Sequence, residues 1–194
     1  EPTRTVSLRL SDGAGGVTAP RSITLSIAAN PDGAVQYGNE QVVSHLAATG
    51  HQAGDQGDPA IAMLADGGYV VTYTDWSGSD GSSYAVFARR YDANDNALGD
   101  PFRVNVSTAN TQDEPTVVGL AGGGFAVIWT SNDGATDPSG DGVFMRRYDA
   151  AGVALDATGL LVNTSTGGSQ YQPAVSQRSD GGFLVAWYSD GARD

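Results

Sequence analysis

The chain has 194 residues, with 22 acidic and ten basic side chains, and its net charge at neutral pH is −12. This balance excludes nucleic acids and anionic membrane surfaces as partners, because both select for basic patches. The 27 glycines are about twice the usual share, which rules out a helical protein, and the absence of cysteine excludes disulfides and thiol chemistry. No apolar run approaches the length of a membrane-spanning helix, so we expect no membrane insertion.

Residues 1–29 read as one β-hairpin. Apolar and polar side chains alternate along residues 6–10 and again along 23–27, and a glycine-rich turn at 11–16 separates the two runs. An isolated hairpin is marginal in water, so this one needs a sheet from elsewhere. Residues 30–40 then form a linker. We expect the hairpin to close a preceding module and the chain to be a piece of a longer polypeptide.

Residues 41–194 contain an internal repeat of about 57 residues. The segment Tyr69–Thr74 recurs as Phe125–Thr130 and again as Phe183–Tyr188, at offsets of 56 and 58 residues. Because several landmarks keep their order and spacing, the sequence predicts tandem structural units. The other landmarks are a proline before each copy and an Arg-Arg-Tyr-Asp motif after the first two, at Pro59, Pro115, Pro173, Arg89–Asp92 and Arg146–Asp149.

Within each repeat the hydrophobic period is two, which is typical of strands. In the first complete repeat we expect four antiparallel strands, at residues 59–64, from 69 to 74, at 85–91 and at 102–106. A four-stranded unit of this length predicts a propeller blade. The predicted fold is therefore all-β: a partial β-propeller-like array of two complete four-stranded antiparallel blades and one partial blade, with an N-terminal Ig-like hairpin.

Four motifs follow one another along the repeat: Gly-Gly-Phe-x-Val-x-Trp, Ser-Asp-Gly, Arg-Tyr-Asp-Ala-x-Gly and x-Val-Asn, seen at Gly181–Trp187, Ser189–Gly191, Arg147–Gly152 and Leu161–Asn163. This set resembles repeats of RTX-type adhesins and haemolysin-like calcium-binding proteins, which are large secreted bacterial proteins. The segment Thr5–Gly13 with Ile23–Leu25 is similar to the closing strands of cadherin-like or Ig-like modules. The resemblance implies export, calcium and an extracellular or cell-surface location. The Gly-Gly-x-Gly-x-Asp nonapeptide of the RTX calcium roll is absent.

The loops between the second and third strands are acidic and rich in glycine. Ca²⁺ takes six to eight oxygen ligands from carboxylates, carbonyls and water on flexible turns, and these loops offer such ligands. We therefore predict bound calcium. The alternative is a solvated hairpin loop whose aspartates cap turns. The predicted ligands are Asp75, Asp80, Asp133, Asp137, Asp141 and Asp190.

Aromatic side chains occupy equivalent positions in the three repeats, at Tyr73, Trp129 and Trp187. A row of aromatic rings can stack on sugars, but the place of these three on the apolar face favours a structural core. The two histidines, His45 and His51, lie in the irregular stretch before the first repeat, where surface positions are expected. No nucleophile, base and acid converge, so we predict no catalytic residues and no enzymatic activity.

The sequence therefore predicts a non-catalytic structural or adhesive segment of a large secreted or cell-surface bacterial protein, stabilised by calcium. The alternative is a carbohydrate-binding or accessory propeller of a secreted polysaccharide-active enzyme. The expected partners are other parts of the same longer polypeptide or a second copy, with a glycan or a host or bacterial surface as the external target. The alternative requires one face of the propeller to gather aromatic and arginine side chains into a pocket.

Overall fold

The computed structural model describes residues 56–134, 136–138 and 140–191, all within one compact unit of the chain. The predicted hairpin and linker, and residues 41–55 of the predicted repeats, lie outside the described residues. No helix in the described ranges is long and apolar enough to cross a membrane. The strands are β1 (Gln56–Met63), β2 (Tyr69–Asp75), β3 (Ala85–Tyr91), β4 (Phe102–Arg103), β5 (Gln112–Gly119), β6 (Phe125–Ser131), β7 (Gly142–Tyr148), β8 (Leu160–Leu161), β9 (Gln170–Gln177) and β10 (Phe183–Ser189).

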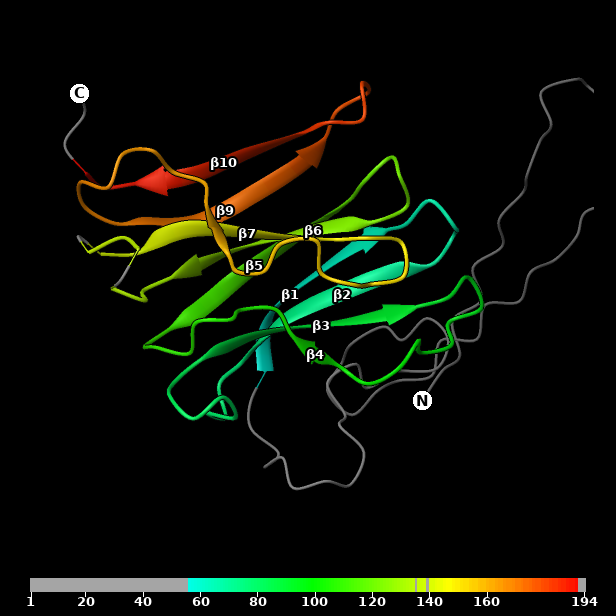
Figure 1. Cartoon of the computed structure of the whole chain (residues 1–194), viewed down its shortest axis with the longest axis horizontal. Coiled ribbons are helices and arrows are strands. Elements are labelled where there is room, and N and C mark those ends of the chain that lie inside the picture. The colour runs from blue at the N-terminus through cyan, green and yellow to red at the C-terminus, as the bar shows by residue number, and fades with distance from the viewer. Residues whose placement is uncertain (1–55, 135, 139, 192–194) are drawn as a thin grey trace, which may run out of the picture. The chain divides into compact units, whose positions relative to one another are not determined.

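The strands pair into three antiparallel sheets in chain order (Figure 1). The first sheet contains β1 to β4, the second β5 to β8, and the third β9 and β10. This confirms the predicted all-β repeat of antiparallel strands. The fourth strand is shorter than predicted and ends at Arg103. It ends there because the carbonyl of Val86 still accepts the N–H of Val104, whereas the N–H of Val86 donates to the side-chain Oδ1 of Asn105 in place of a backbone carbonyl.

The second strand of the second sheet, β6, is buried on both faces because it lies between two other sheets. Phe125, Val127 and Trp129 face the first sheet and share a cluster with Val70 and Val86. On the opposite face of β6, Ala126 and Ile128 pack with side chains of β9 and β10 in the third sheet. Each fully buried large side chain of this kind stabilises the fold by roughly 1.5–3 kcal/mol. The first and third sheets therefore pack on opposite faces of the second sheet through the side chains of β6.

The turn between the first and second strands is the same in all three sheets. Gly67, Gly123 and Gly181 adopt φ angles of 84°, 87° and 86°, which favour glycine because it has no Cβ. In the first sheet the turn is closed by the N–H of Leu64, which donates to the carbonyl of Gly68 at 2.8 Å. The same glycine-containing turn therefore reverses the chain between the first and second strands of each sheet.

Arginine side chains reinforce the contact between the first two sheets. The guanidinium of Arg90 donates to the carbonyls of Ala151 and Ala150, at 2.7 and 2.6 Å, in a turn of the second sheet. In the opposite direction, Nη1 of Arg146 donates to the carbonyl of Val104 at 2.9 Å. These bonds fix the lateral position of one sheet on the other, which apolar contacts alone fix poorly.

A buried asparagine joins each four-stranded sheet to the sheet that follows it. The side chain of Asn163 is 3% exposed. Its Oδ1 accepts the N–H of Val143 at 2.8 Å, and its Nδ2 donates to Oε1 of Gln170 at 2.8 Å. Asn105 makes the same two bonds one repeat earlier, to Val86 and Gln112. One amide group thus connects the third strand of one sheet to the first strand of the next.

We predict that Asn163→Ala lowers the free energy of unfolding by about 3 kcal/mol, because several buried partners lose their hydrogen bond together. Thr164→Ala changes an exposed neighbour and serves as the control. Urea denaturation followed by circular dichroism measures both variants. Equal midpoints for the two variants would contradict a structural role for the buried amide.

Candidate functional site

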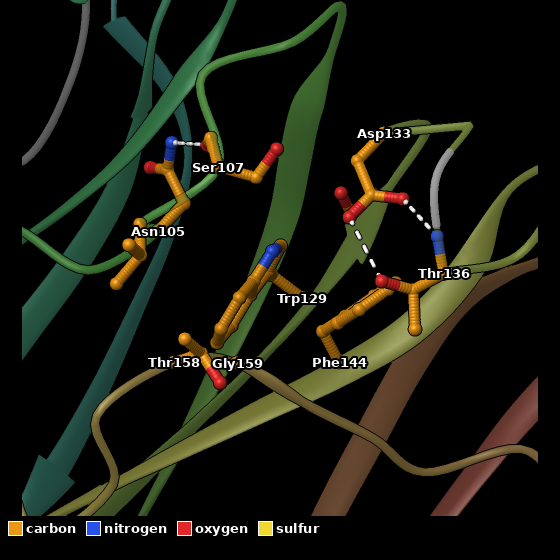
Figure 2. Close-up of a pocket in the computed structure, with 10 residues that line it drawn as sticks. Asn105, Ser107, Trp129, Asp133, Thr136, Phe144, Thr158 and Gly159 are labelled. Carbon is orange, nitrogen blue, oxygen red and sulfur yellow. Dashed lines mark hydrogen bonds between the residues drawn. The ribbon is translucent and has the colours of Figure 1, made fainter.

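A pocket of about 370 Å³ opens where the loop after β4 meets the second sheet (Figure 2). The second sheet supplies aromatic walls from β6 and β7, and the loops supply hydroxyl, amide and carboxylate groups. Its volume lies near the lower end of the usual range for small-molecule sites. The lining residues of the described chain are Asn105, Val106, Ser107, Trp129, Ser131, Asp133, Thr136, Phe144, Thr158 and Gly159.

Trp129 is the central wall of this pocket. The residue is 2% exposed, and its ring stacks on Phe144 with centroids 6.1 Å apart and planes inclined by 25°. Its indole Nε1–H is buried and has no hydrogen-bond partner in the described structure. Figure 2 shows this nitrogen directed toward the open space between Ser107 and Asp133. Buried N–H groups are nearly always satisfied, so this unpaired donor marks the pocket as a candidate binding site.

Gly159 keeps the pocket beside Trp129 open. A Cβ at this position would lie 3.0 Å from Cζ2 of Trp129 and 3.3 Å from Cδ1 of Phe144. Any side chain would therefore press on both rings. The chain approaches the aromatic pair this closely only because residue 159 is glycine.

The polar rim of the pocket is held in place by local hydrogen bonds. Asp133 accepts the backbone N–H of Thr136 at 3.0 Å and its hydroxyl at 3.4 Å. On the other side, Nδ2 of Asn105 donates to the carbonyl of Ser107 at 2.8 Å. The rim is therefore preformed, which lowers the entropic cost of binding a ligand.

A second, shallow hollow of about 240 Å³ lies where the first strands of the three sheets come together. An acidic or amide residue precedes a proline in each strand, at Asp58, Glu114 and Gln172, and all three adopt φ between 50° and 53°. Oδ2 of Asp58 accepts the hydroxyl of Thr74 at 3.0 Å. Oε2 of Glu114 accepts the hydroxyl of Thr130 and the N–H of Gln172. The carboxylates of Asp58 and Glu114 therefore accept hydrogen bonds from donors on neighbouring strands.

Asp113 lies beside this hollow on β5. Burial, and to a smaller extent the nearby carboxylates of Glu114, Asp58 and Asp141, raise its pKa to about 7. The folded protein therefore holds a proton on Asp113 at pH values where the unfolded chain has released it. Stability consequently falls as the pH rises from about 4 to about 7.

We predict that Asp113→Asn raises the free energy of unfolding at pH 8 by ~1–2 kcal/mol after allowance for solvent screening, because the amide cannot ionise. At pH 4 the carboxyl is protonated in the folded state, and the gain should be small. Asp100→Asn removes one exposed charge and is the control. Thermal melting of the three proteins at both pH values measures the effect. A gain that is equal at pH 4 and pH 8 would contradict the raised pKa.

Two of the predicted calcium ligands lie at the end of β2 and in the β2–β3 loop, at Asp75 and Asp80. Asp75 is 8% exposed and accepts the N–H of Ser77 at 2.8 Å and the hydroxyl of Ser79 at 2.7 Å. Oδ1 of Asp80 accepts the N–H of Ser82, while its buried Oδ2 has no partner in the described structure. Both aspartates therefore order the loop itself.

The other predicted ligands are spread over the second and third sheets. Asp137 is 1% exposed and accepts Nδ2 of Asn163 at 3.1 Å. Asp141 accepts Nδ2 of Asn132 at 3.0 Å, and Asp190 accepts a backbone N–H at 2.6 Å. Asp133 lies on the rim of the Trp129 pocket. In the described ranges, no three Asp, Glu or His side chains gather as a metal site. Calcium thus stays a prediction, in which backbone carbonyls and water would supply most ligands.

We predict that the melting temperature rises between a chelator and a few millimolar CaCl₂, and rises less with matched MgCl₂, because a ligand of the folded state stabilises it by mass action. Differential scanning calorimetry in the three buffers measures the effect. Superimposable melting curves would contradict the calcium prediction.

The outcome for the predicted aromatic row differs along the chain. Tyr73 and Trp129 are buried as predicted, at 6% and 2% exposure. Trp187 is 37% exposed, so the prediction of a core position is wrong for the described structure. The reason is that β10 pairs with β9 alone in the described ranges, whereas β2 and β6 each have a third strand beside them. The sequence does not predict the pocket, because the place of Trp129 on the apolar face of its strand indicates a core position and not a binding wall.

No known protein family matches the chain, and no curated protein matches it in sequence. Among solved structures, the endo-arabinase from Bacteroides thetaiotaomicron VPI-5482 is similar, with a TM-score of 0.51 and 12% sequence identity. The three sheets are blades of a β-propeller. The match covers 84% of this chain and 60% of the endo-arabinase chain. At this identity the likeness concerns the fold alone.

Proposed function

We propose that this chain is a carbohydrate-binding part of a propeller in a secreted polysaccharide-active protein. The observation that carries the proposal is the unsatisfied indole N–H of Trp129 in a preformed pocket with aromatic walls and a hydroxyl-rich rim. A sugar presents an apolar C–H face that packs on aromatic rings and hydroxyls that accept an N–H bond. Among the buried polar atoms that lack a partner in the described residues, the Trp129 N–H is the one whose residue lines this pocket.

The carbohydrate-binding alternative requires a pocket that gathers aromatic and arginine side chains, and the Trp129 pocket meets this requirement in part. It gathers aromatic and polar side chains at one blade junction, but no arginine lines it among the described residues. Hydroxyl, amide and carboxylate groups take the place of the expected arginine.

In this proposal the chain binds a sugar without cleaving it. Cleavage of a glycosidic bond generally uses a pair of carboxyl groups on either side of that bond. Asp58 and Glu114, in the shallow hollow where the first strands of the three sheets come together, instead accept hydrogen bonds from Thr74 and Thr130 of the neighbouring strands. In this proposal these two carboxylates therefore have a structural role.

The matched endo-arabinase makes arabinan the first polysaccharide to test. This chain spans 60% of the length of that enzyme, so the activity of the whole protein is a separate question. An extracellular location, calcium, the relation to RTX-type proteins and association with further parts of the same polypeptide remain part of the proposal.

We predict that Trp129→Phe weakens sugar binding by about tenfold, because the aromatic wall remains while the donor is lost, and one hydrogen bond is worth about 1–1.5 kcal/mol. Isothermal titration calorimetry against arabinan, galactan, mannan and β-glucan measures binding. Quenching of tryptophan emission provides a second signal, since Trp129 is one of three tryptophans.

Trp187→Phe is the matched control, because Trp187 has the same place in the repeat but does not line the pocket. It should bind as the unaltered protein does. Circular dichroism verifies that both variants fold. The proposal fails if no polysaccharide binds the unaltered protein, or if the two variants lose affinity equally. Release of reducing ends from any of the four polysaccharides would overturn its non-catalytic part.

A further inference from the structure

The Trp129 pocket has a hydrogen-bond donor on one side and a negative charge on the other. The indole Nε1–H can only donate a hydrogen bond, and an ionised carboxylate such as that of Asp133 can only accept one. Thr136 holds this carboxylate at the rim through its backbone N–H and its hydroxyl. Figure 2 shows the open space of the pocket between the two groups.

This pair of groups separates ligands by charge. An anionic group would accept the Trp129 N–H but would lie in the same small pocket as Asp133. A cationic group would be attracted to Asp133 but would place its charge before the positive end of the indole N–H. A neutral hydroxyl accepts the indole N–H and carries no charge that Asp133 can repel.

The surroundings of the pocket strengthen this selection. The described lining residues include the hydroxyl groups of Ser107, Ser131, Thr136 and Thr158, and no basic side chain. The net charge of the chain is −12, so the field of the whole chain repels anions as the carboxylate of Asp133 does. Repulsion between like charges is also larger in a partly enclosed pocket than in bulk water.

We propose that this pocket binds a neutral sugar unit and that Asp133 excludes uronic acids from it. The inference rests on the proposed function and names its ligand class. Asp133 thereby determines specificity, while Trp129 supplies the donor that any sugar would use. An acidic polysaccharide would be a poor ligand, even where its neutral counterpart binds.

The test uses methyl arabinofuranoside and the methyl pyranosides of galactose, mannose and glucose, each paired with the uronate made by oxidising its primary hydroxyl. The unaltered protein should bind the best neutral glycoside at least ~tenfold more tightly than its uronate at low salt. Asp133→Asn should narrow that ratio to about threefold or less, with some loss of affinity for the neutral glycoside. Asp100→Asn makes the same change of net charge away from the pocket and should keep the original ratio.

Salt gives a second measurement that does not depend on a variant. Raising the salt from about 0.01 M to about 1 M shortens the screening length to about 3 Å, so uronate binding should improve while neutral binding stays constant. Equal binding of neutral and uronate forms by the unaltered protein would overturn the inference. So would a ratio that neither Asp133→Asn nor salt changes, although neutral binding would then leave the proposed function standing. If neither form binds, the proposed function fails and the inference fails with it.

Discussion

The geometry of this protein depends on a single amide side chain at each blade junction. Asn105 is almost fully buried, and it accepts a bond from β3 while it donates one to Gln112 at the start of the next blade. Leaving such groups unpaired in a low-dielectric interior is costly, so the pair of blades has one favourable arrangement. The Trp129 pocket lies at this junction and Asn105 is part of its wall. The shape of the pocket therefore follows from the structural bonding of the repeat.

Much of the fold could be predicted from the sequence because the same pattern of turn and strand occurs three times along the chain. The period of two along Tyr69–Tyr73, the glycine turn before it and the proline before Ala60 each express a local backbone preference. The length of the fourth strand could not be predicted in this way. It is set by Asn105, whose side chain takes the place of a backbone carbonyl opposite Val86.

The candidate site at Trp129 was harder to predict, for a physical reason. A tryptophan on the apolar face of a strand has the same pattern whether its N–H is satisfied or not. The missing acceptor for Trp129 becomes visible only when the loop after β4 and the β6–β7 loop are both in place. The raised pKa of Asp113 could not be predicted from the sequence for a similar reason. Its main cause is burial in the folded protein, and one of the carboxylates that contribute, Asp58, belongs to the preceding blade.

The connecting loops differ in whether the two complete blades share the same loop length. The loop from β4 to β5 and the loop from β8 to β9, residues 104–111 and 162–169, are equal in length, whereas residues 132–141 between β6 and β7 outnumber residues 76–84 between β2 and β3. The loops of equal length carry the buried asparagines, and an insertion there would break the junction. Asp133 and Thr136 lie in the β6–β7 loop, which is one residue longer than the β2–β3 loop. In the proposed function, residues that select the sugar thus lie on a loop whose length differs between the two complete blades.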